Sequence, residues 1–251
     1  LKYFGDGTVK AFVYGSGHRC ILPNEEVGSQ LAVLQEFQDY TNELIQARRK
    51  APEEDMITFL TTVEYSPLSR KLTDAEINGI VYAMVIGGLE TTQYALAEQV
   101  QLLIEHQDVW RALKQDKRKI RAFTEEGMRL RAPTQGLSTR TTSQEEVFQG
   151  ITVPKGSFLH MRWAAANIDP MEWEDPSALK LDRKAGTRHL TFSQGARVCP
   201  GASLSRLEQV EAWNALIDRI GHFEYAPDNT FVHQPGIMLG VVKLNLAFKK
   251  Q

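Results

Sequence analysis

Apolar side chains recur at helical spacing over much of the chain, so helix is the dominant prediction. Residues 31–49 place their apolar positions on one helical face. A second helix is expected after Pro52, in the stretch EEDMITFLTTV, because its first turn is acidic. Two further helices are predicted near residues 107–116 and 119–131, and Pro133 ends the later one.

The longest helix is predicted between Thr73 and about Glu105. Thr73 and Glu76 have the spacing of a capping box, which marks a helix start. A helix of about 33 residues would be roughly 50 Å long. Its middle, GIVYAMVIGGL, is apolar on all sides, and this predicts burial on every side. Glu76, Glu90 and Glu98 argue against a membrane span.

After Pro133 the pattern changes from helices to short strands. Residues 134–160 hold Thr- and Val-containing runs separated by the turn signals QG and PKG. The stretch WAAANI predicts a short helix, and residues 169–188 predict an irregular loop. Strands are expected over residues 223–248. A further helix is expected after Pro200, with an apolar, buried face formed by Leu204, Leu207, Val210, Leu216, Ile217 and Ile220. The predicted class is mainly α with minor β, in a single domain that covers the whole chain.

Composition narrows the class of protein. The chain has 251 residues, 42% hydrophobic and 24% charged, with a net charge of −2. This balance gives no support for nucleic-acid binding or for a basic membrane surface. The two cysteines, Cys20 and Cys199, form neither a zinc-type spacing nor a disulfide framework, so a cytoplasmic location is expected. The first residue is Leu1 rather than methionine, as expected for a fragment, a processed chain or a sequence whose beginning is missing.

Cys199 is the first candidate for chemistry. It lies between Gly195 and Gly201, just before the helix predicted after Pro200. The positive end of a helix dipole and unpaired backbone N–H groups favour a thiolate there. Arg197 could pair with an anionic group, and the glycines allow close approach of a flat cofactor. A metal ligand fits these features, while a buried structural cysteine and a catalytic nucleophile remain alternatives.

The second candidate lies in the middle of the long helix, in the stretch GGLETT. Two glycines inside a helix cost roughly 1 kcal/mol each relative to alanine and would make room for a ligand. Thr91 can hydrogen-bond back to the carbonyl of Gly87. A hydroxyl beside the carboxylate of Glu90 is a possible proton relay. The alternative is simple helix packing at the glycines, with Glu90 facing outward.

These motifs together resemble the cytochrome P-450 family. The string FSQGARVCPG, from Phe192 to Gly201, matches the family's haem-ligand signature at every defined position. GGLETT resembles its oxygen-activating helix. Glu126 and Arg129, whose spacing alone is typical of a solvated ion pair, resemble its glutamate–arginine pair, with Arg183 as the third member. WAAANIDP and TFVHQPGIMLGV also match in family order, so the C-terminal part of that fold is implied, with the N-terminal portion missing.

The resemblance implies roles for individual residues. Heme b is the implied cofactor, with Cys199 as its axial thiolate ligand. Further cofactor contacts are implied for Arg197, His189, Arg140, Phe192, Gly195 and Gly201. Proton delivery to dioxygen is implied for Thr91 and Glu90. The implied substrate-pocket residues are Ile86, Gly87, Leu137, Ile237 and Met238, and the implied structural residues are Glu126, Arg129 and Arg183.

The implied function is that of a monomeric haem-thiolate monooxygenase. It would insert one atom of dioxygen into a small apolar or aromatic substrate, with electrons from a ferredoxin-type or flavin reductase partner. The basic residues Lys184, Arg188 and Arg206 predict that an acidic donor docks near the cysteine loop. Two alternatives stay open: a peroxide-using or isomerising haem-thiolate enzyme, and a haem-binding protein without turnover.

Overall fold

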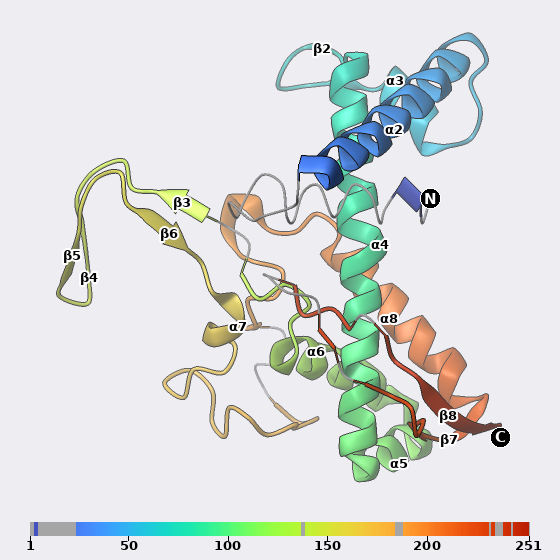
Figure 1. Ribbon diagram of the computed structural model, residues 1–251, viewed down its shortest axis with the longest axis vertical. Coiled ribbons are helices and arrows are strands. Elements are labelled where there is room, and N and C mark those ends of the chain that lie inside the picture. The colour runs from blue at the N-terminus through green and yellow to red at the C-terminus, as the bar shows by residue number, and fades with distance from the viewer. Residues whose placement is uncertain are drawn as a thin grey trace. The chain divides into compact units, whose positions relative to one another are not determined.

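The computed structural model describes residues 3–4, 24–136, 139–183, 188–230, 232–233, 238–241 and 243–250. The chain divides into two compact units, Leu1–Glu90 and Thr91–Gln251. The division falls inside the longest helix, α4, which spans Asp74–Glu105 and so contributes to both units (Figure 1). The single domain expected from the sequence stays a prediction.

The first unit is built from helices and one small hairpin. Besides the start of α4 it contains α2 (Asn24–Lys50), α3 (Met56–Thr62), β1 (Glu64–Tyr65) and β2 (Arg70–Lys71). The two strands pair antiparallel. Ile45, Leu60 and Ile77 form its buried apolar cluster. The helix predicted over residues 31–49 is confirmed and begins earlier than expected.

The N-terminus of α4 is closed by the predicted capping box. The Thr73 backbone N–H donates to Glu76 Oε2 at 2.8 Å, and the Glu76 N–H donates to Thr73 Oγ1 at 3.3 Å. Arg70 donates to both carboxylate oxygens of Glu76 at 2.8 Å each. The bonds from Arg70, followed by those from Thr73, lower the pKa of Glu76 to about 2. The predicted start of the long helix is therefore confirmed.

The prediction that the middle of α4 is buried on every side is wrong. Met84 is 49% exposed and Leu89 is 37% exposed. A Cβ added at Gly87 or Gly88 would meet no atom within 4 Å. An apolar helix surface shows only that something can pack against it, and the described residues leave much of this stretch open. Within the described part of the chain, none of the helices is long and apolar enough to cross a membrane.

The helices of the second unit surround one apolar core. The C-terminal part of α4 is followed by α5 (Gln107–Gln115), η2 (Lys117–Lys119), α6 (Ile120–Leu130) and later α8 (Ala202–Ile217) (Figure 1). Phe123 meets Trp213 edge-on, with ring centroids 5.6 Å apart, and Trp110 meets Phe223 at 4.8 Å. Trp110, Phe123 and Trp213 are each no more than 2% exposed, so large aromatic side chains dominate this core.

A buried amide network connects α4 to α8. Gln99 Nε2 donates to Gln209 Oε1, and Trp213 Nε1 donates to Gln99 Oε1, both at 2.6 Å. The hydroxyls of Thr92 and Ser205 lie 3.0 Å apart. Buried polar groups destabilise a fold unless they are hydrogen-bonded, so this network selects one register of α8 against α4.

The strands of the second unit form antiparallel pairs. β3 (Thr139–Thr141) pairs with β6 (Phe158–His160), β4 (Glu146–Phe148) with β5 (Ile151–Val153), and β7 (Ile220–Tyr225) with β8 (Leu246–Lys250). The β4–β5 hairpin extends away from the helices of this unit (Figure 1). The second unit also contains two short helices, α7 (Trp163–Ala166) and η4 (Gly195–Arg197). The mainly α class with minor β is confirmed.

Candidate functional site around Cys199

The loop that carries Cys199 is shaped by its own backbone. The Cys199 N–H donates to the carbonyl of Phe192 at 2.9 Å, and the Val198 N–H donates to that of Gly195 at 3.1 Å. Gly195 has a φ of 79° and Ser193 a φ of 61°, both in the left-handed region that favours glycine. Gly195 therefore serves the turn geometry of the loop.

The thiol of Cys199 lies at the N-terminal end of α8. The Ala202 N–H donates to the Cys199 carbonyl at 3.3 Å, and Gly201 is the N-cap of the helix with no side-chain cap. Cys199 is a free, partly buried cysteine. Cys199 thus lies at the positive end of the α8 dipole, a position that suits an anionic ligand of a metal. This environment supports a thiolate ligand.

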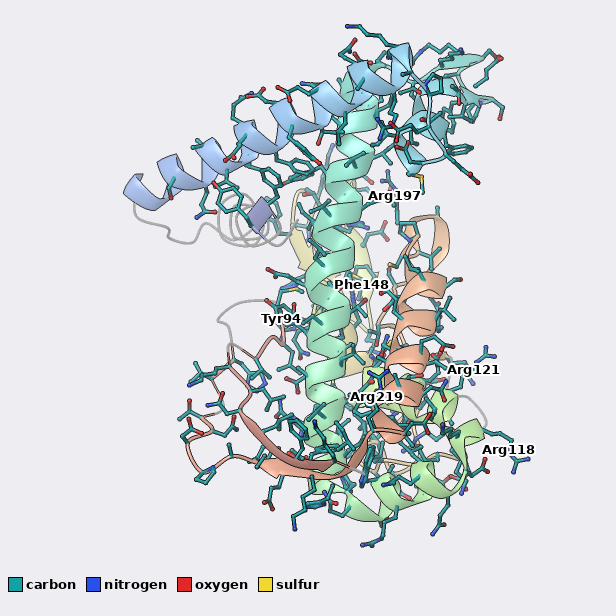
Figure 2. All side chains as sticks on the ribbon, turned by 90° about the vertical axis from the view of Figure 1, so that its right-hand side faces the viewer. Tyr94, Arg118, Arg121, Phe148, Arg197 and Arg219 are labelled. Carbon is teal, nitrogen blue, oxygen red and sulfur yellow. The ribbon has the colours of Figure 1, made fainter. Side chains whose placement is uncertain are left out.

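No group of three or more His, Cys, Asp or Glu residues in the described ranges could hold a metal ion by itself. A single thiolate therefore suits a metal whose other ligands come from a bound macrocycle. Arg140 on β3 and Arg197 on η4 line one hollow of about 540 Å³. Arg197 lies near the N-terminal end of α8 (Figure 2). Two guanidinium groups that share a hollow favour a ligand with carboxylates, so these residues fit a haem and its propionates.

Arg140 also borders a second hollow of about 420 Å³. Its other lining residues are Met161, Arg162, Trp163, Ala166, Leu190, Ser193 and Gln194. The two hollows share Arg140, so the strand that carries it adjoins both. This places β3, α7 and the start of the cysteine loop around one region of the second unit.

Glu125 binds two side chains next to the cysteine loop, those of Arg206 and His189. Its carboxylate is buried and accepts hydrogen bonds from Arg206 Nε at 2.6 Å and from His189 Nε2 at 3.0 Å. The Arg206 guanidinium also lies over the ring of Phe192, 4.5 Å from its centroid. Burial raises the pKa of Glu125, but the bonds from His189 and Arg206 outweigh it and hold that pKa below its usual value. His189, which the resemblance assigned to the cofactor, is thus placed against a carboxylate.

The basic cluster expected to receive an electron donor is reduced by ion pairing. Arg206 is bound to Glu125, and Arg188 pairs with Glu172. Lys184 lies outside the described residues. An arginine that already pairs with a carboxylate has less charge to offer a partner, so neither arginine is a free docking charge.

Glu126 joins two arginines in a buried cluster. Arg129 donates to both Glu126 oxygens at 2.8 Å each, and Arg183 Nε donates to Oε1 at 2.7 Å. Arg129 Nη1 also donates to the carbonyls of Asn167 at 2.8 Å and Pro176 at 2.7 Å. Burial raises the pKa of Glu126, but the two arginines more than offset this and lower it. The cluster ties α6 to the irregular loop before the cysteine, which supports a structural role.

The remaining candidates are divided between the two units. Ile86, Gly87 and Glu90 belong to the first unit, whereas Thr91 and Met238 belong to the second. Met238 is 8% exposed and forms a β-bridge with Thr134. Leu137 and Ile237 lie outside the described residues, as does Cys20.

No sequence pattern indicated the roles of Glu125 and Arg206 at the cysteine loop. They are 81 positions apart, so no local spacing marks the pair. The available signal was Glu125 itself, as an additional glutamate next to Glu126. Two adjacent carboxylates on a buried helix each need a partner, and the structure supplies different arginines to each.

Known proteins similar to this chain belong to one family. A family model described as Cytochrome P-450 matches residues 21–227. The polyketide biosynthesis cytochrome P-450 PksS of Bacillus subtilis (strain 168) is 31% identical over 229 residues, or 90% of this chain and 55% of that protein. The biotin biosynthesis cytochrome P-450 of the same organism is 33% identical over 181 residues, or 72% of this chain and 45% of that protein. The chain thus spans about half the length of the curated relatives it matches.

Solved structures share the fold. Cytochrome P-450 BioI, in complex with an acyl carrier protein ligated to hexadec-9Z-enoic acid, matches with a TM-score of 0.87 at 26% identity, over 99% of this chain and 61% of that chain. The ligand-free structure of cytochrome P-450 TbtJ1 matches with a TM-score of 0.90 at 24% identity, over 99% of this chain and 63% of that chain. The second likeness shows the fold alone, and together they confirm the fold expected from the motifs.

Proposed function

Since this chain belongs to the cytochrome P-450 family, we propose that it carries the haem-thiolate centre of a monooxygenase. The reaction would insert one oxygen atom from dioxygen into a small, apolar or aromatic organic substrate. The observation that carries the proposal is the setting of Cys199. Its thiol lies at the start of α8, on a loop closed by its own N–H, in the unit where Arg140 and Arg197 share a hollow.

Heme b is the cofactor of the family and fits this site. Cys199 Sγ would hold the iron, and Arg140 and Arg197 would neutralise the propionates. Phe192 would pack beside the thiolate, while Gly195 and Gly201 would let the backbone approach the macrocycle. The bound haem would supply the redox chemistry that activates dioxygen, which side chains cannot perform.

Proton transfer would be the task of two neighbouring residues of α4. Both Glu90 and Thr91 are half-buried, so each retains some contact with solvent. Thr91 Oγ1 would present a proton at the oxygen-binding side, and the Glu90 carboxylate would replace it from solvent. This acid–hydroxyl pair favours the monooxygenase over the peroxide-using or isomerising alternative.

Substrate selection would depend on an apolar wall. The residues that the family resemblance assigns to the substrate are Ile86, Gly87, Leu137, Ile237 and Met238. Their side chains offer no charge, so apolar or aromatic substrates are expected. Electrons would come from a ferredoxin-type or flavin reductase, and a monomeric, cytoplasmic protein is part of the same proposal.

The proposal is tested by the spectrum of the haem-loaded chain. The reduced protein with carbon monoxide is expected to show the red-shifted Soret band of thiolate ligation. Cys199→Ser should abolish that band, whereas Cys20→Ser, the matched control, should leave it unchanged. A band typical of histidine ligation in the unchanged protein would overturn the assignment of Cys199.

Turnover distinguishes the alternative functions. Oxidation of an apolar substrate supported by ferredoxin and its reductase is expected, with a loss of product in Glu90→Gln and Thr91→Val. Faster turnover with peroxide than with the reductase would favour the peroxide-using alternative. Stoichiometric haem retention without oxygen consumption would favour a haem-binding protein without turnover.

A further inference from the structure

A buried carboxylate on α4 lies outside the site described so far. Glu98 is 0% exposed, and its Oε1 accepts a hydrogen bond from His233 Nε2 at 2.8 Å and from Gln101 Nε2 at 3.3 Å. Its Oε2 is buried and has no hydrogen-bond partner among the described residues; Arg131 Nη1 is 3.9 Å away. An isolated buried charge is strongly unfavourable, so His233 is the main group that compensates Glu98.

His233 belongs to the C-terminal segment, residues 232–233 and 238–241 of the described chain. His233 and Val241 form an antiparallel β-bridge, which joins the two ends of this segment. One-third of the His233 side chain is exposed, whereas Glu98 is fully buried. α4 therefore binds the segment through a side chain that is itself fully buried.

The other contacts described for the segment are apolar packing, backbone hydrogen bonds and one hydrogen bond to the sulfur of Met238. A Cβ added at Gly240 would lie 2.7 Å from the Tyr94 ring, so the segment packs directly on that side chain (Figure 2). Tyr94 and Glu98 are four residues apart, so both lie on one face of α4. The Leu239 N–H donates to the Pro133 carbonyl at 2.7 Å. Among these ties, the bond from His233 to Glu98 is the one assisted by charge, which makes it the strongest single candidate anchor.

We propose that His233 is a positioning residue: by binding Glu98 it holds the segment that carries Met238 in place and so sets the affinity of the pocket for apolar ligands. The inference rests on the proposed function, in which Met238 lines the pocket. Met238 is held between the anchored ends of the segment, and its sulfur accepts a hydrogen bond from Thr134 Oγ1 at 3.5 Å. A segment released at His233 would give Met238 more than one position, so ligand affinity would fall.

Other charged and titratable groups surround the pair. Arg131 follows α6 and also pairs with Glu105 of α4 at 3.3 Å. The pKa of Tyr225 on β7 is raised, chiefly by burial. The charges of Glu105 and Glu98 raise it further, and the charge of Arg131 lowers it. Glu105 shares Arg131 with Glu98 but makes no described contact with His233, so Glu105→Gln is a matched control for a lost carboxylate.

The test compares His233→Leu, His233→Gln and Glu105→Gln in the haem-loaded chain. Hydrogen exchange of the peptide over residues 232–241 reports on anchoring, independently of activity. Binding of imidazole and of phenylimidazole reports on the pocket, because both bind the iron but only the phenyl ring reaches beyond it. His233→Leu should speed exchange about tenfold and weaken phenylimidazole binding about tenfold, with imidazole changed less than about twofold.

The conservative variant separates position from charge. Glutamine keeps an N–H donor, so His233→Gln should retain most of the phenylimidazole affinity, and Glu105→Gln should match the unchanged protein. Should His233→Leu not fold, the double variant Glu98→Leu with His233→Leu removes the buried charge together with the donor and takes its place. Equal losses for imidazole and phenylimidazole, or unchanged exchange, would overturn the proposal. If the unchanged protein lacks the thiolate band, the proposed function fails, and the exchange comparison still decides the anchoring.

Discussion

The guanidinium of Arg206 lies 4.5 Å from the centroid of the Phe192 ring, directly behind the cysteine loop. Glu125 holds this guanidinium in place with a hydrogen bond of 2.6 Å. The carbonyl of the same phenylalanine accepts the N–H of Cys199. A buried carboxylate on α6 is thereby linked, through one arginine, to the backbone that presents the thiol.

We expect Arg206→Leu to destabilise the fold by about 3 kcal/mol, because Glu125 would keep only His189 as a partner. Urea unfolding followed by circular dichroism measures this free energy. The matched control is Arg188→Leu, which removes an exposed ion pair with Glu172 and should change stability by less than about 1 kcal/mol. Equal effects of the two variants would contradict a specific role for Arg206.

The Glu126 cluster should be more sensitive still. Glu126→Gln leaves Arg129 and Arg183 without their shared counter-charge in a site where the glutamate is 1% exposed. A loss of about 3–5 kcal/mol in the free energy of unfolding is expected. Glu211→Gln, at an exposed position of α8, should stay within about 0.5 kcal/mol. A small effect of Glu126→Gln would show that the cluster does not support the fold.

Glu98 predicts a pH dependence with a defined sign. Burial raises the pKa of its carboxyl group, and the bonds from His233 only partly oppose this. Its contribution to stability is therefore present below the unfolded pKa of about 4.3 and is lost as the pH rises through the raised folded value. Glu98→Gln resembles the protonated form, so its stability relative to the unchanged protein should increase as the pH rises above about 4.3.

Glu76 provides the opposite sign. Its pKa is lowered to about 2 by Arg70 and Thr73, so its stabilising effect is present above the unfolded value and lost as the pH falls through about 2. Above the unfolded pKa, Glu76→Gln should have a lower free energy of unfolding than the unchanged protein. This difference should shrink as the pH falls towards about 2. Unfolding curves measured from about pH 2 to above about pH 4.3 test the predicted pH dependence of both variants. Parallel pH profiles for the two variants would contradict the assignments.

Two helical glycines should respond to alanine in opposite ways. A Cβ at Gly127 would lie 2.7 Å from Gln99 Cγ in the buried amide network, so Gly127→Ala should cost about 1–3 kcal/mol. A Cβ at Gly88 would meet nothing within 4 Å, so Gly88→Ala should stabilise the chain by about 1 kcal/mol through helix propensity. Thermal unfolding distinguishes them, and a destabilising Gly88→Ala would show that something does pack there.

The shared hollow of Arg140 and Arg197 predicts their contribution to cofactor retention. Replacing either by leucine should speed transfer of haem to an acceptor globin about tenfold, because one charge-assisted contact to a propionate is lost. Arg219→Leu is the control, since this arginine lies at the opposite end of α8 from Arg197 (Figure 2). If all three variants lose haem at the same rate, the hollow does not hold the propionates.

Local patterns predicted the parts of the protein that local forces build. The Thr73–Glu76 spacing predicted the start of α4, and hydrogen bonds between residues three apart form that cap. The spacing of Glu126 and Arg129 predicted an ion pair but a solvated one, whereas the structure has it buried. The loop from Phe192 to Cys199 is likewise closed by backbone hydrogen bonds between residues a few positions apart.

Contacts between distant segments were not predictable in this way. Glu98 and His233 are 135 positions apart, so neither spacing nor residue type marked them as partners. Leu204 and Leu207 were expected on the buried face of α8, yet they are 56% and 57% exposed. Near them the buried positions are Gln209 and Trp213, and Gln99 hydrogen-bonds to both. Val210, Leu216, Ile217 and Ile220 do pack in the core, so the apolar periodicity failed only over the first two turns of the helix.

The bond from the Cys199 N–H to the Phe192 carbonyl has a consequence for how a cofactor is captured. Every tie described for that loop is made by the protein itself: this bond, the turn at Gly195, and the arginine behind Phe192. Ordering a loop at the moment of binding lowers affinity, because its conformational entropy is lost then. Each of these contacts reduces the loop entropy that is left to lose when a cofactor binds, so removing one of them should weaken cofactor retention.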